Sequence, residues 1–585
     1  MKITETLNNT KPKTAQNSEK EQAITGAEAI MRCLVEEGTE TIFGYPGGAI
    51  MPVYDALYDY MDRINHILVR HEQGAAHAAQ GYARVSGKPG VCLVTSGPGA
   101  TNLVTGIADA LMDSTPMICI VGQVKDTLLG TDAFQEADVM NITSPITKWN
   151  FQITRADEIP EVMAKAYYIA NSGRPGPVFI DVTKNAQQDK MTKPFEYKKC
   201  KQLSNYHPRI VPKPDQVAAA AKLINGAKKP YLFVGHGVLI AKAEAELLAF
   251  AEKSGIPAAS TLLGLSAFPV DHPLYVGMLG MHGNYGSNVL INEADVIIGL
   301  GMRFDDRVTG ELSKFATNAK IVHIDIDPAE INKIVKAEAP VVGDAKEVLK
   351  ALLPLIDKKE HTAWLNQFKE LHKLEYEKVI KAEIQPHAGG AITMGEVINL
   401  LSEKTKGTAT IIADVGQHQM ISARYYNFAK TDGWVTSGGM GTMGFALPAA
   451  FGVKVANPKR EAIAVIGDGC FQMTIQELGT IAQSKLPVKI IILNNNYLGM
   501  VRQWQELFFN NRYSFVELQN PDFVAISKGF GIFGEKVATR DELEGALERM
   551  LESDVPYLLD VTVIKQHNVF PMVATGSGVS EMRLE

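Results

Sequence analysis

Short apolar runs alternate with segments of helical periodicity along most of this chain. The runs are bounded by glycine, proline and asparagine, which are typical of strand ends and turns. Strands alternating with helices predict α/β units built on parallel sheets. We expect strands at residues 41–43, 66–69, 91–95, 117–121, 231–234, 296–300, 321–326, 462–466 and 488–493.

Changes in composition divide the chain into three α/β units and the segments between them. Prolines cluster before residue 215 and predict a linker, and a charged helical stretch between the second and third units predicts a connector with a solvated face. The expected boundaries are a disordered tail over 1–22, a first unit over 23–192, a linker over 193–214, a middle unit over 215–356, a connector over 357–390, a third unit over 391–565 and a C-terminal tail over 566–585.

The third unit carries the motif with the clearest chemistry. Its first strand breaks at Gly467-Asp468-Gly469, a helix is expected over 471–484, and the following strand ends at Asn494-Asn495. Because a right-handed crossover returns the second strand parallel to the first, Asp468 and the two asparagines should meet at one edge of the sheet. A carboxylate and an amide oxygen among glycines suit Mg²⁺ held together with a diphosphate. A Gly-Asp-Gly turn alone is weak evidence for a cofactor site, since such turns often only end a strand.

The first unit repeats this arrangement with one informative difference. Residues 90–121 and 461–492 share an apolar strand, a Gly-x-Gly turn, a helix and a strand led by proline. Common supersecondary sterics could also produce the likeness. Pro98 stands where the third unit has Asp468, and proline cannot ligate a metal, so the first unit should serve a cofactor in another way.

Composition narrows the class of protein. With 46% hydrophobic and 21% charged residues and a net charge of −7, the 585-residue chain is expected to be globular and to have no nucleic-acid partner. Its five cysteines are scattered and are expected to be free thiols. The apolar runs are too short to span a membrane. Residues 1–22 lack arginine and an apolar core, so we expect a cytoplasmic protein.

The pairing of Asp468 with Asn495 resembles the thiamine-diphosphate signature. The continuation Gly499-Met500-Val501-Arg502-Gln503-Trp504-Gln505 resembles the acetohydroxyacid synthases (acetolactate synthases), and the likeness extends from about Gly26 to Val573. The segment 301–310, GMRFDDRVTG, closely resembles the flavin-associated motif of the FAD-containing anabolic members. By itself the RFDDR part of that segment would more often be a surface turn of ion pairs than a flavin site. The resemblance implies three consecutive doubly wound parallel-sheet domains: pyrimidine-binding, FAD-associated and diphosphate-binding.

The resemblance also implies roles for individual residues, each of which has a plainer reading. Glu72 would be the catalytic glutamate, although a carboxylate in the first turn of a helix is also favoured by the helix dipole. Met443 would bend the cofactor, although a methionine among glycines is most often core filler. The implied catalytic residues are Glu72, Gln135, Lys184 and Met443, and the implied substrate contacts are Gly48, Phe134, Arg307, Met500 and Trp504. The implied thiamine-diphosphate contacts are Gly416, Gln417, His418, Gln419, Met443, Gly467, Asp468 and Gly469, with Asp468, Asn495 and the Tyr497 carbonyl as metal ligands. The implied FAD contacts are Arg174, Gly235, Gly237, Thr261, Leu262, Gly280, Met281, His282, Gly301, Arg303, Asp305, Arg307, Asp325 and Asp344.

The activity implied by the resemblance is that of an acetohydroxyacid synthase catalytic subunit. It would decarboxylate pyruvate on thiamine diphosphate and join the hydroxyethyl unit to pyruvate or 2-oxobutanoate, with Mg²⁺ and a non-redox FAD. The expected partners are a second copy of the chain, giving a homodimer with active sites at the interface or a tetramer, and a small regulatory subunit. Two alternatives stay open: a flavin oxidoreductase of the pyruvate oxidase type, and a catalytically inactive protein that binds the cofactor.

Overall fold

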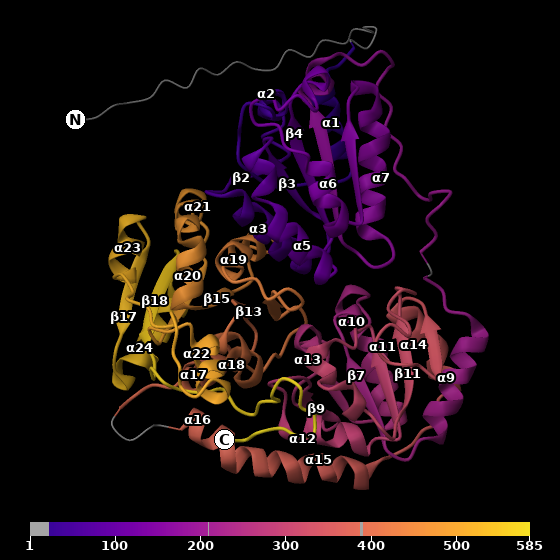
Figure 1. Cartoon of the computed structure of the whole chain (residues 1–585), viewed down its shortest axis with the longest axis vertical. Coiled ribbons are helices and arrows are strands. Elements are labelled where there is room, and N and C mark those ends of the chain that lie inside the picture. The colour runs from indigo at the N-terminus through magenta and orange to yellow at the C-terminus, as the bar shows by residue number, and fades with distance from the viewer. Residues whose placement is uncertain (1–22, 209, 386–389) are drawn as a thin grey trace.

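Three α/β units, each built on a six-stranded parallel sheet, make up the chain (Figure 1). The structure, a computed structural model, describes residues 23–208, 210–385 and 390–585. The predicted tail over 1–22 and part of the predicted connector lie outside the described residues. The predicted fold class is confirmed, and the predicted strands form with ends that differ by no more than a few residues.

The first unit is a sheet with strand order β2-β1-β3-β4-β6-β5. Its buried strands are apolar on both faces, as expected where helices cover both sides of a parallel sheet. The strands are β1 (Thr41–Gly44), β2 (Asn65–Leu68), β3 (Gly90–Val94), β4 (Met117–Gln123), β5 (Trp149–Ile153) and β6 (Pro177–Thr183). The helices are α1 (Gly26–Glu36), α2 (Met51–Tyr58), α3 (Glu72–Ser86), α4 (Pro98–Thr101), α5 (Val104–Met112), α6 (Val139–Thr143), α7 (Ile159–Asn171) and α8 (Lys184–Gln188).

The third unit has the strand order β14-β13-β15-β16-β18-β17. When the strands of each unit are numbered along the chain, the first and third units have the same strand order. The strands are β13 (Thr410–Ala413), β14 (Trp434–Thr436), β15 (Ala462–Gly467), β16 (Lys489–Asn494), β17 (Phe533–Val537) and β18 (Tyr557–Thr562). The helices are α17 (Met394–Thr405), α18 (Gln417–Tyr425), α19 (Ala446–Ala456), α20 (Asp468–Thr474), α21 (Leu478–Ser484), α22 (Gly499–Phe508), α23 (Phe523–Gly529) and α24 (Arg540–Glu552). The repeat seen in the sequence is therefore a repeat of topology, and Pro98 and Asp468 follow equivalent strands.

The middle unit has a different sheet, with strand order β12-β11-β10-β7-β8-β9. Read from β9, this is the order 3-2-1-4-5-6 of dinucleotide-binding folds, whose ligands bind where the order reverses, here between β7 and β10. The strands are β7 (Pro230–Val234), β8 (Ala258–Ser260), β9 (Tyr275–Met278), β10 (Val296–Leu300), β11 (Lys320–Asp325) and β12 (Ala339–Val342). The helices are α9 (Pro214–Gly226), α10 (Gly237–Ile240), α11 (Glu244–Ser254), α12 (Tyr285–Val289), α13 (Asp306–Thr309) and α14 (Ala345–Leu352).

The helix expected over 471–484 is interrupted. A 3-10 turn over Ile475–Glu477 separates α20 from α21, and α20 already begins at Asp468. The buried Glu477 carboxylate accepts hydrogen bonds from the backbone N–H groups of Arg70 and His71, both at 3.0 Å, and from the Thr480 hydroxyl at 2.7 Å. This contact between the third and first units accompanies the break in the helix.

The charged stretch before the third unit is only partly solvated. It forms α15 (Thr362–Glu375), a π-helical turn (Tyr376–Ile380) and α16 (Lys381–Ile384), which lie along the lower edge of the molecule in Figure 1. Trp364 and Phe368 are buried in the core of the middle unit, and Glu375 is fully buried. The expectation of a solvated helix is wrong for this face, because the charge of Glu375 is paired with Arg424 inside the protein.

The last residues of the chain pack across two units. After β18 the chain crosses to the middle unit, where Val579 joins the core and Gly578 pairs with Gly310. In Figure 1 the yellow C-terminal segment lies beside β9 and α12. Across the described ranges, the structure shows no helix that is long and apolar enough to cross a membrane.

Candidate functional site

The strand ends of the third unit form a crevice where the strand order reverses, between β13 and β15. The crevice is a small cavity of about 50 Å³. It brings together most of the residues for which the sequence predicts diphosphate and metal contacts: Gly416, Gln417, His418, Met443, Gly467, Asp468, Gly469, Asn495 and Tyr497. Gln419 does not line it, because its amide donates to Thr436 Oγ1 at 2.7 Å and to Ser437 O at 3.2 Å.

Asp468 and Asn495 lie at the ends of neighbouring parallel strands, β15 and β16. Both side chains are buried, and burial raises the pKa of Asp468 to about 6. Asn495 donates its amide nitrogen to Gln417 Oε1 at 3.3 Å, and its Oδ1 accepts from the backbone N–H of Tyr497 at 3.1 Å. A carboxylate oxygen and an amide oxygen, converging on one cavity, are the donor types that Mg²⁺ binds.

Asp414 holds the loop that carries Met443. Its fully buried carboxylate accepts hydrogen bonds from the backbone of Gly444 and Ala446, both at 2.9 Å, and of Val415 at 2.8 Å. Burial raises the pKa of Asp414. Sequence reasoning missed this residue, although an aspartate directly after a buried strand is a signal that could have found it.

His418 lines the same cavity. Burial lowers the pKa of His418 to about 3, so the imidazole is neutral at pH 7, and its Nε2 is buried without a protein partner. His418, Asp414 and Cys470 place one possible ligand atom each within 4.8 Å of one another. The Cys470 thiol donates to Val415 O at 3.1 Å, and the Asp414 carboxylate is bonded to backbone N–H groups, so internal hydrogen bonds account for this cluster.

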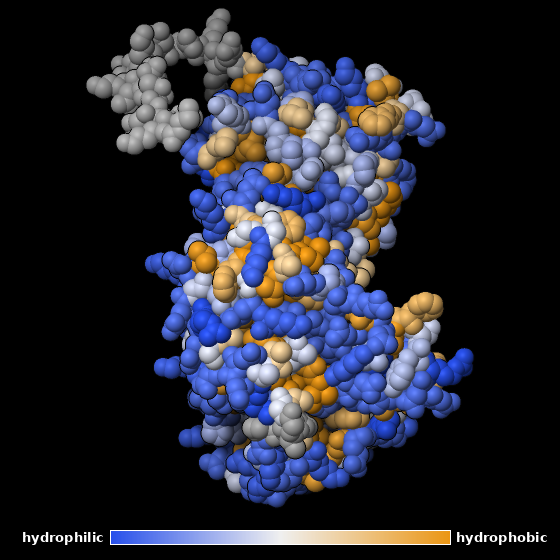
Figure 2. Space-filling model, turned by 90° about the vertical axis from the view of Figure 1, so that its left-hand side faces the viewer, coloured by the Kyte–Doolittle hydropathy of each residue, from blue (hydrophilic) through white to orange (hydrophobic). Residues whose placement is uncertain are grey.

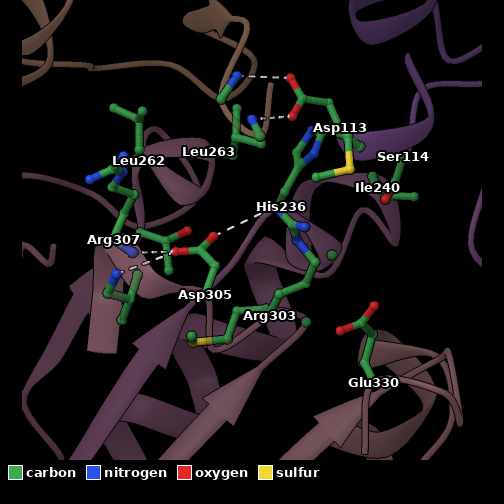
Figure 3. Close-up of a pocket in the computed structure, with 18 of the residues that line it drawn as sticks. Asp113, Ser114, His236, Ile240, Leu262, Leu263, Arg303, Asp305, Arg307 and Glu330 are labelled. Carbon is green, nitrogen blue, oxygen red and sulfur yellow. Dashed lines mark hydrogen bonds and ion pairs between the residues drawn. The ribbon is translucent and has the colours of Figure 1, made fainter. Parts of the chain in front are cut away.

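A much larger cavity, of about 790 Å³, lies where all three units meet (Figure 3). Its volume is in the range of cofactor and ligand sites. It contains every residue for which the sequence predicts a FAD contact except Gly235: Arg174, Gly237, Thr261, Leu262, Gly280, Met281, His282, Gly301, Arg303, Asp305, Arg307, Asp325 and Asp344. Met500 lines both cavities and Trp504 lines the large one.

Glycines bring two loops of the middle unit together at the floor of this cavity. Gly301 has a φ of +57°, and a Cβ there would lie 2.8 Å from the Cα of Gly237. A Cβ on Gly235 would lie 2.2 Å from Gly301 O, which places Gly235 behind the lining rather than in it. Glycine is therefore required at these positions, which follow the ends of β7 and β10.

The ionisable groups that line the large cavity differ in how closely the protein pairs them. Burial raises the pKa of Asp325 to about 7 and lowers the pKa of His282 to about 4. His282 Nδ1 contacts Pro571 O at 3.1 Å, and its Nε2 is buried without a partner. The Arg307 side chain is 59% exposed, and its ion pair with Asp306 is long, with 3.7 Å between Nε and Oδ2. Arg174, from the first unit, bonds Glu330 at 2.9 Å.

Two aspartates of the first unit, Asp109 on α5 and Asp113 directly after it, bind the glycine-rich loop over residues 437–444 of the third unit. Asp113 accepts from the backbone of Gly438 at 2.9 Å and Gly439 at 2.7 Å (Figure 3). It also pairs with Arg84 at 2.6 Å. Asp109 accepts from the Ser437 hydroxyl at 2.5 Å. Burial and the charge of Asp113 raise the pKa of Asp109 to about 6. Sequence reasoning missed both residues, because their partners lie far along the chain.

The remaining predicted site residues lie at the corresponding edge of the first unit. Glu72 begins α3, is 9% exposed, and accepts a hydrogen bond from Asn102 at 2.9 Å. This position also suits a first-turn charge on the helix dipole. Gln135 has a φ of +62°, and Phe134 is 89% exposed. Gly48, Glu72, Phe134, Gln135 and Lys184 line neither of the two cavities described above.

Comparison with known proteins shows that all three units match domains of one enzyme family. The N-terminal TPP binding domain of thiamine pyrophosphate enzymes matches residues 24–142, their central domain matches 217–352, and their C-terminal TPP binding domain matches 414–561. The acetolactate synthase large subunit of Corynebacterium glutamicum is 47% identical over 573 residues, covering 96% of this chain and 90% of the relative. This chain belongs to the acetolactate synthase family of thiamine pyrophosphate enzymes.

Other family members give the same result. The large subunit of Haemophilus influenzae is 44% identical over 566 residues, covering 96% of this chain and 98% of the relative. The isozyme 2 large subunit of Escherichia coli is 45% identical over 561 residues, covering 96% of this chain and 99% of the relative. The predicted family is confirmed, and these names do not favour the pyruvate oxidase alternative.

Proposed function

We propose that this chain decarboxylates pyruvate on thiamine diphosphate and joins the hydroxyethyl unit to a second 2-oxo acid, pyruvate or 2-oxobutanoate. The products are 2-acetolactate and 2-aceto-2-hydroxybutanoate, precursors of branched-chain amino acids. The observation that carries the proposal is the cavity shared by Asp468 and Asn495, which Met500 joins to the larger cavity lined by Trp504 and Arg307. Membership of the family supplies the reaction.

The small cavity would hold Mg²⁺ and the diphosphate. Asp468, Asn495 and the Tyr497 carbonyl are the proposed metal ligands, and the donors are oxygens, as Mg²⁺ requires. The N-terminus of α20, which begins at Asp468, favours negative charge beside it. When bound, thiamine diphosphate supplies the electron sink for decarboxylation. Met443, on the loop held by Asp414, would be the apolar side chain that bends the cofactor.

The active site needs a second copy of the chain. Glu72, the proposed partner of the pyrimidine ring, lies at the edge of the first unit together with Gly48, Phe134, Gln135 and Lys184, outside the cavity of Asp468. A homodimer related by a twofold axis brings the edge of one first unit to the edge of the partner's third unit. Exposed apolar side chains near both edges support this, with Phe134 89% and Phe515 100% exposed. Figure 2 shows apolar patches on the face that the first and third units form.

The large cavity would hold FAD in a non-redox role. The strand order of the middle unit, the close approach of Gly237 and Gly301, and the unpartnered His282 Nε2 support a dinucleotide there. No step of the proposed reaction transfers electrons, so the flavin would be structural.

Arg307 and Trp504 would select the second substrate. A guanidinium binds a carboxylate through two parallel hydrogen bonds, and the Arg307 side chain is exposed in the cavity mouth. The indole of Trp504 would contact the alkyl tail. Gln135 and Lys184 would act on the substrate from the partner's first unit. We also propose a small regulatory subunit, a dimer or tetramer as the assembly, and a cytoplasmic location.

The test is a product assay with defined cofactors. Purified protein with pyruvate, thiamine diphosphate, Mg²⁺ and FAD should form acetolactate while the flavin spectrum stays unchanged. Bleaching of the flavin with acetate or acetyl phosphate as product would indicate an oxidase instead. Cofactor binding without any turnover, with the small subunit added, would indicate a binding protein.

A further inference from the structure

A segment following α22 folds back over the proposed metal site. Residues 516–518 pair antiparallel with 496–498: Leu498 N donates to Val516 O at 2.8 Å, and Leu518 N donates to Asn496 O at 2.9 Å. This pairing brings Asn520 to the ends of β15 and β16, far from either strand in sequence.

The Asn520 amide nitrogen lies among three acceptor oxygens. It contacts Asp468 Oδ2 at 2.7 Å, Asn494 Oδ1 at 3.0 Å and Asn496 Oδ1 at 3.1 Å. Its own oxygen accepts from Gln472 Nε2 at 3.0 Å. An amide nitrogen carries two N–H groups, so these oxygens share two donors.

The neighbouring bonds fix which end of the amide faces Asp468. Asn494 donates its own nitrogen to Asp560 at 2.9 Å, so its oxygen is the atom that faces Asn520. Gln472 donates to the opposite end of Asn520. The nitrogen of Asn520 therefore points at the carboxylate, and a nitrogen that donates cannot bind a cation.

Both oxygens of Asp468 thus have an N–H donor. Oδ1 accepts from Gly469 N at 3.0 Å and Oδ2 accepts from Asn520. Two donors on different oxygens fix the rotation of the carboxylate and leave its other lone pairs for an ion. Groups of this kind, which orient a metal ligand without touching the metal, affect metal affinity about 10–100-fold when mutated.

We propose that Asn520 is a positioning residue that orients Asp468 toward the divalent cation. The proposal rests on the metal site given under the proposed function and adds a residue that the sequence motif does not contain. It also gives the segment 516–520 a role, since docking of that segment supplies the donor. Asn520 contributes to binding of the cation and the diphosphate and to no later step.

The experiment is a Mg²⁺ titration of thiamine-diphosphate binding, followed by quenching of protein fluorescence. Asn520→Ala should raise the Mg²⁺ concentration for half-maximal binding about tenfold. Flavin binding should match the wild type. The matched control is Asn399→Ala, because the Asn399 amide also donates to a carboxylate, Glu403, at 2.8 Å, but on the surface of α17. It should leave the titration unchanged.

A second variant keeps the test decisive if Asn520→Ala does not fold. Gln472→Ala removes the donor that orients the Asn520 amide and should raise the Mg²⁺ requirement in the same direction by a smaller factor. An unchanged Mg²⁺ requirement in the folded variants would overturn the role of Asn520 alone. Wild-type protein that binds thiamine diphosphate equally well without a divalent cation would instead overturn the proposed metal site.

Discussion

The buried ion pair between Arg424 and Glu375 joins the third unit to the connector and to the middle unit beside the large cavity. Arg424 lies on α18 of the third unit, Glu375 ends α15, and Arg424 also donates to the carbonyls of His282 at 3.0 Å and Gly283 at 2.8 Å. His282 lines the cavity. Loss of the pair should therefore lower both stability and flavin retention.

The burial of both side chains sets the size of the expected loss of unfolding free energy. The Arg424 side chain is 1% exposed and the Glu375 side chain is 0% exposed, with 2.5 Å between them. Removing one partner of such a pair leaves an uncompensated buried charge and costs about 3–5 kcal/mol. We expect that loss for Arg424→Met and for Glu375→Gln. The double variant leaves no unpaired charge, so it should be no less stable than either single variant.

The assay is a double-mutant cycle in urea-induced unfolding, with flavin absorbance measured after gel filtration. Each single variant should unfold at lower urea and lose flavin, and the double variant should recover part of the stability. Additive losses, or single variants within about 1 kcal/mol of the wild type, would refute the claim that two buried charges compensate each other here.

Three further changes test separate parts of the account. Gly301→Ala places a Cβ 2.8 Å from Gly237 at a φ of +57°, so flavin should be lost from the purified protein, whereas Gly226→Ala, with nothing within 4 Å, should retain it. Burial raises the pKa of Glu477 from 4.5 to about 7, so its contribution to stability is complete below about pH 4.5 and is lost as the pH rises to about 7. The wild type should therefore lose up to about 3 kcal/mol of unfolding free energy between pH 4.5 and 8, a loss that Glu477→Gln should not show. A difference between the two proteins that does not change with pH would contradict this. Trp504→Leu should mainly lower the preference for 2-oxobutanoate over pyruvate, by about 1–3 kcal/mol, and an unchanged product ratio in direct competition would refute its assigned contact.

Local patterns in the sequence predict the parts of the site that lie on consecutive elements. Asp468 and Asn495 follow two strands joined by one crossover, so the handedness of that crossover places them at one edge before any coordinates are known. The three α/β units follow from the same periodicity. Gly301 and Arg303 follow a buried strand in the same way.

Contacts between distant segments could not be predicted. Asp113 bonds Gly438 and Gly439 only because α5 packs against the third unit. Asn520 has no neighbouring signal, since its partner strands end far from it in sequence. The break at Glu477 accompanies hydrogen bonds to the first unit, and the periodicity of this segment contains no information on that contact.

The most direct test of the two-chain active site is complementation between two inactive variants. Glu72→Gln and Asp468→Asn, each inactive alone, are co-expressed with different tags and the hybrid is assayed. In a twofold dimer whose sites take Glu72 from one chain and Asp468 from its partner, each hybrid has one intact site of two, so the purified hybrid should show about half of the wild-type activity. If both residues served a site within one chain, every site would carry a defect and no activity would return.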